Sequence, residues 1–203
     1  MKRSSPGKQN GLILLGLFTI LLRYPLTPSP TGTDNFYYIS MAKSIISSGQ
    51  IFAGEELLSL YGLFPGTSPQ GATLLASAVT FTTGLSIYDY VLIHGISLSL
   101  ISTFGFFMLS GELTDNYRSR WFATLCFSLA PRFLTFSSWR ISLRFMYIAL
   151  LPFFVWLLLR LSNSKHGRHP ARLIALISLF IIVLPSLHRM ALLFPGMLLA
   201  LLV

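Results

Sequence analysis

The chain has 203 residues, of which 53% are hydrophobic and only 10% are charged. Soluble domains carry about 25% charged residues, and disordered chains combine low hydrophobicity with dense charge, so the composition excludes both classes. The net charge of +9 indicates the basic loops of a multi-span membrane protein. It does not indicate nucleic-acid binding, because no compact basic patch with interleaved aromatic residues stands outside the apolar segments. One cysteine, Cys126, excludes an internal disulfide framework and a zinc site of several cysteines.

The first apolar segment follows a short basic start, and we expect it to span the membrane over about 11–27. Arg23 comes directly after its apolar run, and the cleavage site of a signal peptide is absent. A helix rises about 1.5 Å per residue, so this segment is short for a hydrocarbon core of about 30 Å. We therefore expect the Arg23 side chain to reach outward to the lipid headgroups.

The stretch 67–84 is apolar but rich in Thr, Ser, Ala and Gly, and its placement decides the topology. If it does not span, three basic clusters with nine lysines and arginines share one side of the membrane. If it spans, two of these clusters move to the other side. The positive-inside rule favours the first arrangement, with a cytoplasmic N-terminus. This leaves an outer loop over about 28–86, of a length that usually carries function, with an interfacial helix over about 68–83.

Within this loop the sequence predicts a second interfacial helix, over about 35–48. Tyr38 and Ile45 belong to an apolar stripe at helical spacing, and Lys43 and several serines face the other way. Asp34 stands where an N-cap residue is expected. Two roles are open for Asp34: a cap of backbone N–H groups, worth about 1 kcal/mol, or a general base or metal ligand at the membrane surface.

Later apolar stretches complete the prediction of an all-α, polytopic transmembrane protein with one membrane domain over 1–203. The short outer loop between two of these stretches carries Arg140 and Arg144. Their guanidinium groups either bind phosphate oxygens or reach the headgroups from the interface. His188 and Arg189, near the outer end of the last span, leave the same alternatives. The further expected spans are about 88–110, 121–138, 145–161 and 173–188.

Arg132, beside a proline, is a further candidate for the site. It lies nearer the membrane than the two loop arginines, in the expected span over 121–138. A charge there is costly unless it is paired or faces a cavity. We therefore add Arg132 to the residues that are expected to contact a ligand.

The stretch TGTDNFYYISMAKSIISSGQIF, which contains Asp34, resembles the first-loop motif of the GT-C class of integral-membrane glycosyltransferases. This class includes oligosaccharyltransferase catalytic subunits, protein O-mannosyltransferases and lipid A aminoarabinose transferases. Residues 64–69 with the weak helix that follows are similar to their second juxtamembrane helix, and 129–134 with 150–160 are similar to their third and fourth spans. The resemblance covers the N-terminal part of such a protein. Because the sequence ends within apolar residues, we expect 1–203 to be a fragment.

The resemblance implies transfer of a sugar from a polyprenyl-phosphate carrier to an acceptor on the outer face. Asp34 falls on the first-loop acid, which activates the acceptor or helps to hold a divalent cation such as Mg²⁺ or Mn²⁺. Many members place a second acid in the next outer loop, but here that loop reads SSWRISLR and is cationic. This departure argues against a metal site built from two loop acids. Glu55 and Glu56, in the first outer loop, either assist Asp34 or form a solvated turn.

The alternative is a non-catalytic multi-span protein, such as half of a transporter or a degenerate scaffold. Transporters place charges near the middle of the membrane, on broken helices. Here the candidate residues are expected to lie at the outer face, which favours chemistry on a lipid-linked substrate. The expected partners are therefore the bilayer and a polyprenyl-phosphate-linked sugar.

Overall fold

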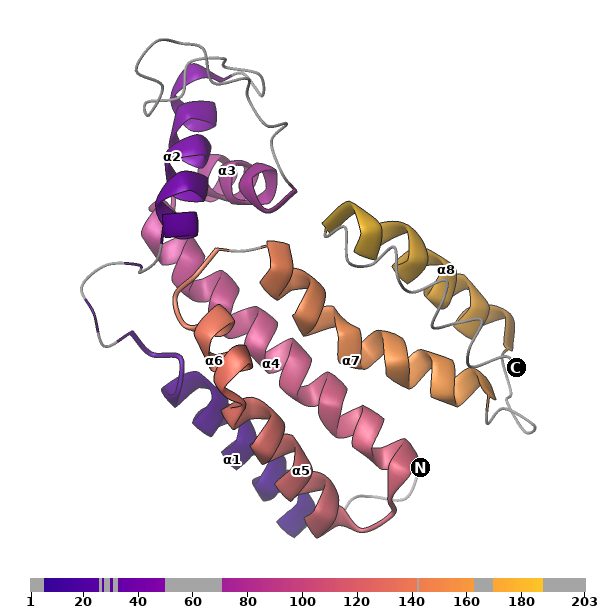
Figure 1. Ribbon diagram of the computed structural model, residues 1–203. Helices are drawn as coiled ribbons and strands as arrows, with labels where there is room; N and C mark the ends of the chain where they lie inside the picture. The colour runs from indigo at the N-terminus through magenta and orange to yellow at the C-terminus, as the bar shows by residue number, and fades with distance from the viewer. Residues whose placement is uncertain are drawn as a thin grey trace.

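The computed structural model describes residues 6–25, 27, 30, 33–49, 71–141, 143–162 and 170–187. This part of the chain is all-helical, without strands, as the sequence predicts. Figure 1 shows α4 at the centre, with α1, α5 and α7 alongside it, α8 against α7, and α2 and α3 beyond one end. The helices are α1 Pro6–Leu21, α2 Thr33–Ser48, α3 Gly71–Thr83, α4 Ile87–Leu113, α5 Tyr117–Leu129, α6 Pro131–Ser137, α7 Leu143–Ser162 and α8 Pro170–Leu187.

The central helix α4 begins at the capping box that its sequence predicts. The Ser86 hydroxyl accepts a hydrogen bond from the N–H of Asp89 at 3.1 Å and donates to the Asp89 carboxylate at 2.6 Å. Small residues then let other elements approach closely. A Cβ on Gly105 would lie 2.6 Å from the Phe153 ring of α7, and a Cβ on Gly95 would lie 3.0 Å from the backbone of α6. Glycine at these two positions therefore permits the packing of α6 and α7 on α4.

Within the described residues, two helices are long and apolar enough to cross a membrane, by length and composition alone: Ile87–Leu113 and Arg144–Ser162. The apolar helices Gln9–Leu21, Gly71–Thr83 and Ala171–Leu184 are shorter. Many large apolar side chains stay exposed on the outside of the bundle, among them several on each of α1, α4 and α8.

The expected span over 121–138 is two helices, not one. Helix α5 ends just before Ala130, and α6 begins at Pro131, because proline has no N–H and its ring clashes with the carbonyl group four residues earlier. The last turn of α5 is tightened, with the N–H of Ala130 donating to the carbonyl oxygen of Phe127 at 3.1 Å. The break leaves the carbonyl group of Ser128, among the last four of α5, without a partner inside its own helix.

Helix α1 ends earlier than the expected span over 11–27. It stops at Leu21, and the next residues form a turn in which the N–H of Arg23 donates to the carbonyl oxygen of Ile20 at 3.0 Å. This turn brings Arg23 into the bundle, where the residue is only 1% exposed. The expectation that Arg23 reaches outward is wrong, because polar partners inside the protein hold its guanidinium group.

Candidate functional site

The side chain of Asn35 connects the first turn of α2 to the α6–α7 loop, residues 138–141. Asn35 is 2% exposed. Its Nδ2 donates to the carbonyl oxygen of Trp139 at 3.2 Å, and its Oδ1 accepts from the N–H of Ile141 at 2.7 Å. These two backbone groups flank Arg140. Asn35 therefore holds the loop on both sides of a candidate site residue.

The loop has a strained backbone at Trp139. Its φ is +46°, in the left-handed region that residues other than glycine rarely adopt. Such a conformation costs on the order of 1–3 kcal/mol and persists only where the surroundings hold it. Besides the hydrogen bond from Asn35, the indole Nε1 of Trp139 donates to the carbonyl oxygen of Tyr88 in the first turn of α4 at 3.3 Å. The loop is thus fixed to both α2 and α4.

Arg23 ties the end of α1 to the break between α5 and α6. Its Nη2 donates to the freed carbonyl oxygen of Ser128 at 3.1 Å, and its Nε donates to the Ser137 hydroxyl at 3.2 Å. Its Nη1 donates to the carbonyl oxygen of Thr19 at 3.2 Å. The guanidinium carbon lies 4.8 Å from the centroid of the Phe133 ring. No acidic side chain pairs with Arg23 in the described part of the chain, so its charge is stabilised by dipoles and an aromatic face.

A chain of buried hydroxyl groups extends this network to α4. The Ser128 hydroxyl lies 3.0 Å from that of Thr103, and the Thr19 hydroxyl donates to the same Thr103 oxygen at 3.5 Å. All three residues are fully buried. Because a buried network of this kind is stable only when its members are satisfied, it fixes α1, α4 and α5 in one arrangement next to the break.

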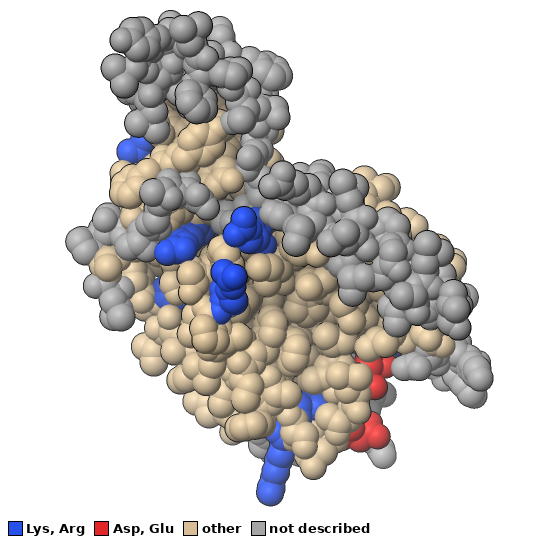
Figure 2. Space-filling view, viewed as in Figure 1, with Lys and Arg blue, Asp and Glu red and all other residues tan. Residues whose placement is uncertain are grey.

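Three further arginines lie between the end of α5 and the first turn of α7, in residues 131–144, which we call the arginine segment. Arg132, in α6, and Arg144, in the first turn of α7, are exposed, and Arg140 in the loop is half-buried. The Arg144 guanidinium carbon lies 5.4 Å from the centroid of the Phe136 ring. Among the described residues, no acid forms an ion pair with any of the three. Figure 2 shows basic side chains gathered where α6 connects to α7, with the visible acidic side chains at the far end of the bundle.

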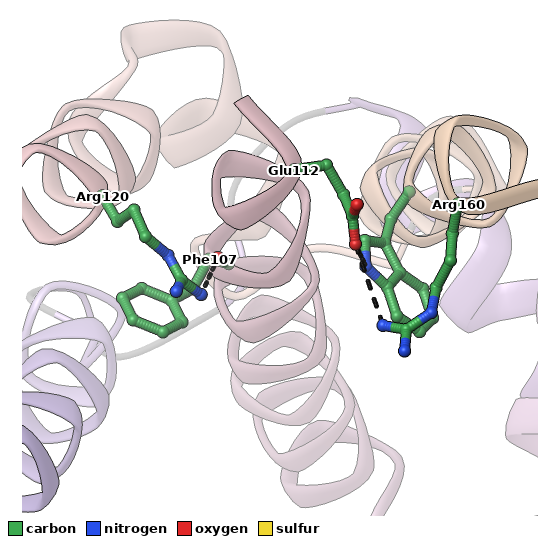
Figure 3. Close-up of polar contacts among 5 residues, drawn as sticks. Phe107, Glu112, Arg120 and Arg160 are labelled. Atoms are coloured by element: carbon green, nitrogen blue, oxygen red, sulfur yellow. Dashed lines mark hydrogen bonds and ion pairs between the residues drawn. The ribbon is translucent and has the colours of Figure 1, made fainter. Parts of the chain in front are cut away.

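Two arginines at that far end, Arg160 and Arg120, have protein partners, as Figure 3 shows. Arg160 of α7 lies 3.8 Å from the carboxylate of Glu112 in the last turn of α4, and the indole of Trp156 donates to the same oxygen at 3.1 Å. On the other side of α4, Arg120 donates to the carbonyl oxygen of Phe107 at 3.1 Å and stacks on the Phe107 ring at 4.3 Å. These two arginines hold helices together.

The other candidate site residues have side chains outside the described part of the structure. Helix α2 begins at Thr33, two residues earlier than expected, so Asp34 lies inside its first turn and not before the helix as an N-cap residue would. Its side chain lies outside the described part of the structure. Glu55, Glu56, His188 and Arg189 lie outside the described residues altogether. The roles proposed for these side chains stay predictions.

Sequence reasoning missed Asn35, although its position carries a signal. Asn35 lies four residues before Ile39 and seven before Ala42, both of which are buried. It is therefore a polar residue on the apolar face of its helix, where a carboxamide needs hydrogen-bond partners. For Arg23 the corresponding signal is Pro131, which frees carbonyl groups in the middle of an apolar stretch.

The described residues around the first turn of α2 do not fit a divalent cation. The carboxamide of Asn35 is engaged with the loop backbone, and the neighbouring ionisable side chain in the loop is Arg140. No three His, Cys, Asp or Glu side chains come together in the described part of the chain. Because the carboxylate of Asp34 lies outside the described side chains, Mg²⁺ or Mn²⁺ at that residue stays a prediction.

Comparison with known proteins gives no relative: no family model matches the chain, and no curated protein or solved structure matches it. Its function is therefore argued from its own residues.

Proposed function

We propose that the chain is a membrane glycosyltransferase-like protein that binds the phosphate group of a polyprenyl-linked sugar at the arginine segment. The observation that carries this proposal is the contrast in pairing. Within the described residues Arg132, Arg140 and Arg144 come from one short segment and have no acidic partner, whereas Arg160 pairs with Glu112. Arg118 and Arg120 at the end that holds Arg160 also lack an ion pair, but Arg120 donates to the carbonyl oxygen of Phe107. Unpaired guanidinium groups offer forked N–H donors whose geometry matches phosphate oxygens.

Exposed apolar surface supports a membrane setting. On α1, Ile13 and Leu17 are 61% and 59% exposed, and on α8, Leu179 and Ile182 are 54% and 71% exposed. Soluble monomers rarely leave large contiguous apolar patches in water. We place α1, α4, α5 with α6, α7 and α8 in the bilayer, with α2 and α3 at its outer surface.

The contacts between helix ends support a cytoplasmic N-terminus. The Trp121 indole in α5 donates to the carbonyl oxygen of Gly11 near the start of α1 at 2.8 Å, and Glu112 pairs with Arg160 at the ends of α4 and α7. The start of α1, the start of α5 and the end of α7 therefore lie at one end of the bundle, and each of them is next in sequence to one of the three basic clusters. The positive-inside rule assigns such an end to the cytoplasm, and the arginine segment then faces outward.

The proposed reaction uses groups from both elements that Asn35 connects: the arginines of the arginine segment and Asp34 of α2. Transfer breaks the bond between the anomeric carbon and the carrier phosphate oxygen, and it forms a bond from that carbon to the acceptor oxygen. The arginines stabilise the charge on the departing phosphate. Asp34, in the turn next to Asn35, accepts the proton of the acceptor hydroxyl or amide group.

The test is lipid binding by the full chain in nanodiscs, with polyprenyl monophosphate and neutral polyprenol as matched probes. Wild-type protein should prefer the phosphate, and the double variant Arg140→Ala/Arg144→Ala should bind it about 10–100-fold more weakly, the usual worth of charge-assisted hydrogen bonds. Arg160→Ala removes a charge at the other end and should keep wild-type affinity. Equal affinity of the wild type for the two probes would contradict the proposal.

One observation favours the alternative of a transporter-like, non-catalytic protein. Transporters use broken helices and buried charges, and the break at Pro131 with Arg23 beside it has both features. The Nε, Nη1 and Nη2 atoms of Arg23 all donate to protein groups, however, which suits a structural role better than a transport site. This alternative would be favoured if the full chain bound the phosphate lipid but did not transfer sugar from a polyprenyl-phosphate-linked donor.

A further inference from the structure

We infer that Asn35 is a positioning residue for the ligand: its carboxamide fixes the backbone on both sides of Arg140 and so sets where that guanidinium group meets a phosphate. The inference rests on the proposed function, since it says how a proposed phosphate-binding arginine is held. It concerns a residue that touches no substrate and acts through its neighbour.

The geometry requires a carboxamide. The contact uses one donor, Nδ2, to the Trp139 carbonyl oxygen, and one acceptor, Oδ1, from the Ile141 N–H. This arrangement imitates the pairing of one peptide strand with another. A carboxylate has the acceptor but no donor, and it would place negative charge against a carbonyl oxygen. At 2% exposure, water does not replace a lost partner, so each missing hydrogen bond counts fully.

The contact controls position because the loop is strained. Without it, the left-handed backbone of Trp139 loses one of its attachments and keeps the indole hydrogen bond to Tyr88 and the packing of the ring against the hydrophobic core. The loop then relaxes toward an ordinary conformation while α4, α6 and α7 stay packed. Such relaxation moves the Cα of Arg140, and displacements of about 1 Å in a binding group are enough to lower activity strongly.

The same contact sets the spacing between the two proposed halves of the site. Asn35 follows Asp34 in the first turn of α2, and its side chain reaches the residues that flank Arg140. The backbone that carries the proposed base is therefore locked to the backbone that carries a proposed phosphate ligand. Asn35 thus fixes the position of the α2 backbone relative to the α6–α7 loop, which lies more than a hundred residues later in the sequence.

The experiment compares Asn35→Asp, Asn35→Ala and Asn35→Gln in the full chain in nanodiscs, with polyprenyl monophosphate and polyprenol as probes. We expect the Asp and Ala variants to bind the phosphate lipid about tenfold more weakly. Gln keeps both the donor and the acceptor and should restore part of the affinity. The matched control is Ser77→Ala, which removes a buried hydroxyl of α3 that donates to the Thr73 carbonyl oxygen at 2.8 Å and lies 3.4 Å from the Ala42 carbonyl oxygen of α2. This variant should bind as the wild type does.

Two readouts separate positioning from a loss of folding. Hydrogen exchange should rise in peptides that cover Ile141 in Asn35→Ala, while peptides from the middle of α4 and α7 keep wild-type protection. In a double-mutant cycle, Asn35→Ala should have no further effect on affinity once Arg140 is alanine. Additive losses would show that Asn35 does not act through Arg140.

The outcomes distinguish the inference from the proposed function. If Arg140→Ala weakens phosphate binding but Asn35→Asp and Asn35→Ala bind normally, the inference is wrong and the proposed function stands. If wild-type protein does not prefer the phosphate probe, the proposed function falls and the inference falls with it. Weak binding in all Asn35 variants with raised exchange throughout α4 and α7 would mean general unfolding, and it would also overturn the inference.

Discussion

The arginines at the two ends of α4 differ in the protein groups that they contact. At its C-terminal end, Arg160 pairs with Glu112, and Arg120 donates to a backbone carbonyl oxygen and stacks on Phe107. At the other end, the arginine segment has no acidic partner within the described residues. Arg118, near the C-terminal end of α4, also has no ion pair within the described residues, so the contrast rests on Arg160 and Arg120, which hold helices together, and not on every arginine at that end.

The arginines at the two ends also affect the free energy of the folded state differently. The Arg160 side chain is 56% exposed, so its ion pair with Glu112 contributes at most about 1 kcal/mol. Arginines without acidic partners, gathered on one face (Figure 2), repel one another instead and raise the free energy of the folded state. A bound anion would relieve that repulsion, so the arginine segment should be more stable with its ligand than without it.

The largest effect should follow from the substitution Asp34→Asn, which tests whether the arginine end contains a base. If Asp34 accepts a proton, transfer from a polyprenyl-phosphate-linked sugar should fall by about 10²–10⁴-fold, with expression and membrane insertion unchanged. If Asp34 only stabilises the first turn of α2 through a side-chain oxygen acceptor, Asn serves nearly as well. Asp89→Asn, which alters a different helix cap, is the control and should keep full transfer activity. Undiminished transfer in the Asp34 variant would remove the base from the proposed mechanism.

Arg23→Met should lower the stability of the protein by about 3 kcal/mol. It leaves the Ser128 carbonyl group and the Ser137 hydroxyl buried with one partner fewer, and each such group costs about 1–3 kcal/mol. The measurement is unfolding of the purified chain by denaturant in micelles. Arg132→Met removes an exposed arginine from the same region and should change stability by less than about 0.5 kcal/mol. Equal stability losses in the two variants would mean that burial does not distinguish the two residues.

The smallest effect should come from Glu112→Gln at the paired end. It weakens the contact with Arg160, but a carboxamide oxygen still accepts from the Trp156 indole. We expect a stability loss below about 1 kcal/mol that shrinks further at high salt. Phosphate-lipid affinity should not change. A large loss of affinity would show that the two ends of α4 are coupled, and the comparison between them would no longer hold.

Local features of the fold were predictable from the sequence, and features that depend on distant contacts were not. The all-helical class and the capping box at Ser86 follow from periodicity and from residues a few positions apart. The Asn35 contact joins residues 106 positions apart, and Arg23 meets Ser137 at a separation of 114. No local pattern specifies such partners. Pro131 predicts a helix break, but the sequence does not show that Arg23 is the residue that donates to the carbonyl group freed by this break.

Because of the helix break at Pro131, the exposed positions of the arginine segment can be substituted without disturbing the helices around it. The residues that fix it in place belong to other parts of the chain: Arg23 after α1, Asn35 in α2 and Gly95 in α4. Exposed positions within the segment contribute little to these attachments. Grafting a different set of side chains onto positions such as 132 and 144 should therefore change the proposed preference for a phosphate headgroup while leaving the scaffold intact.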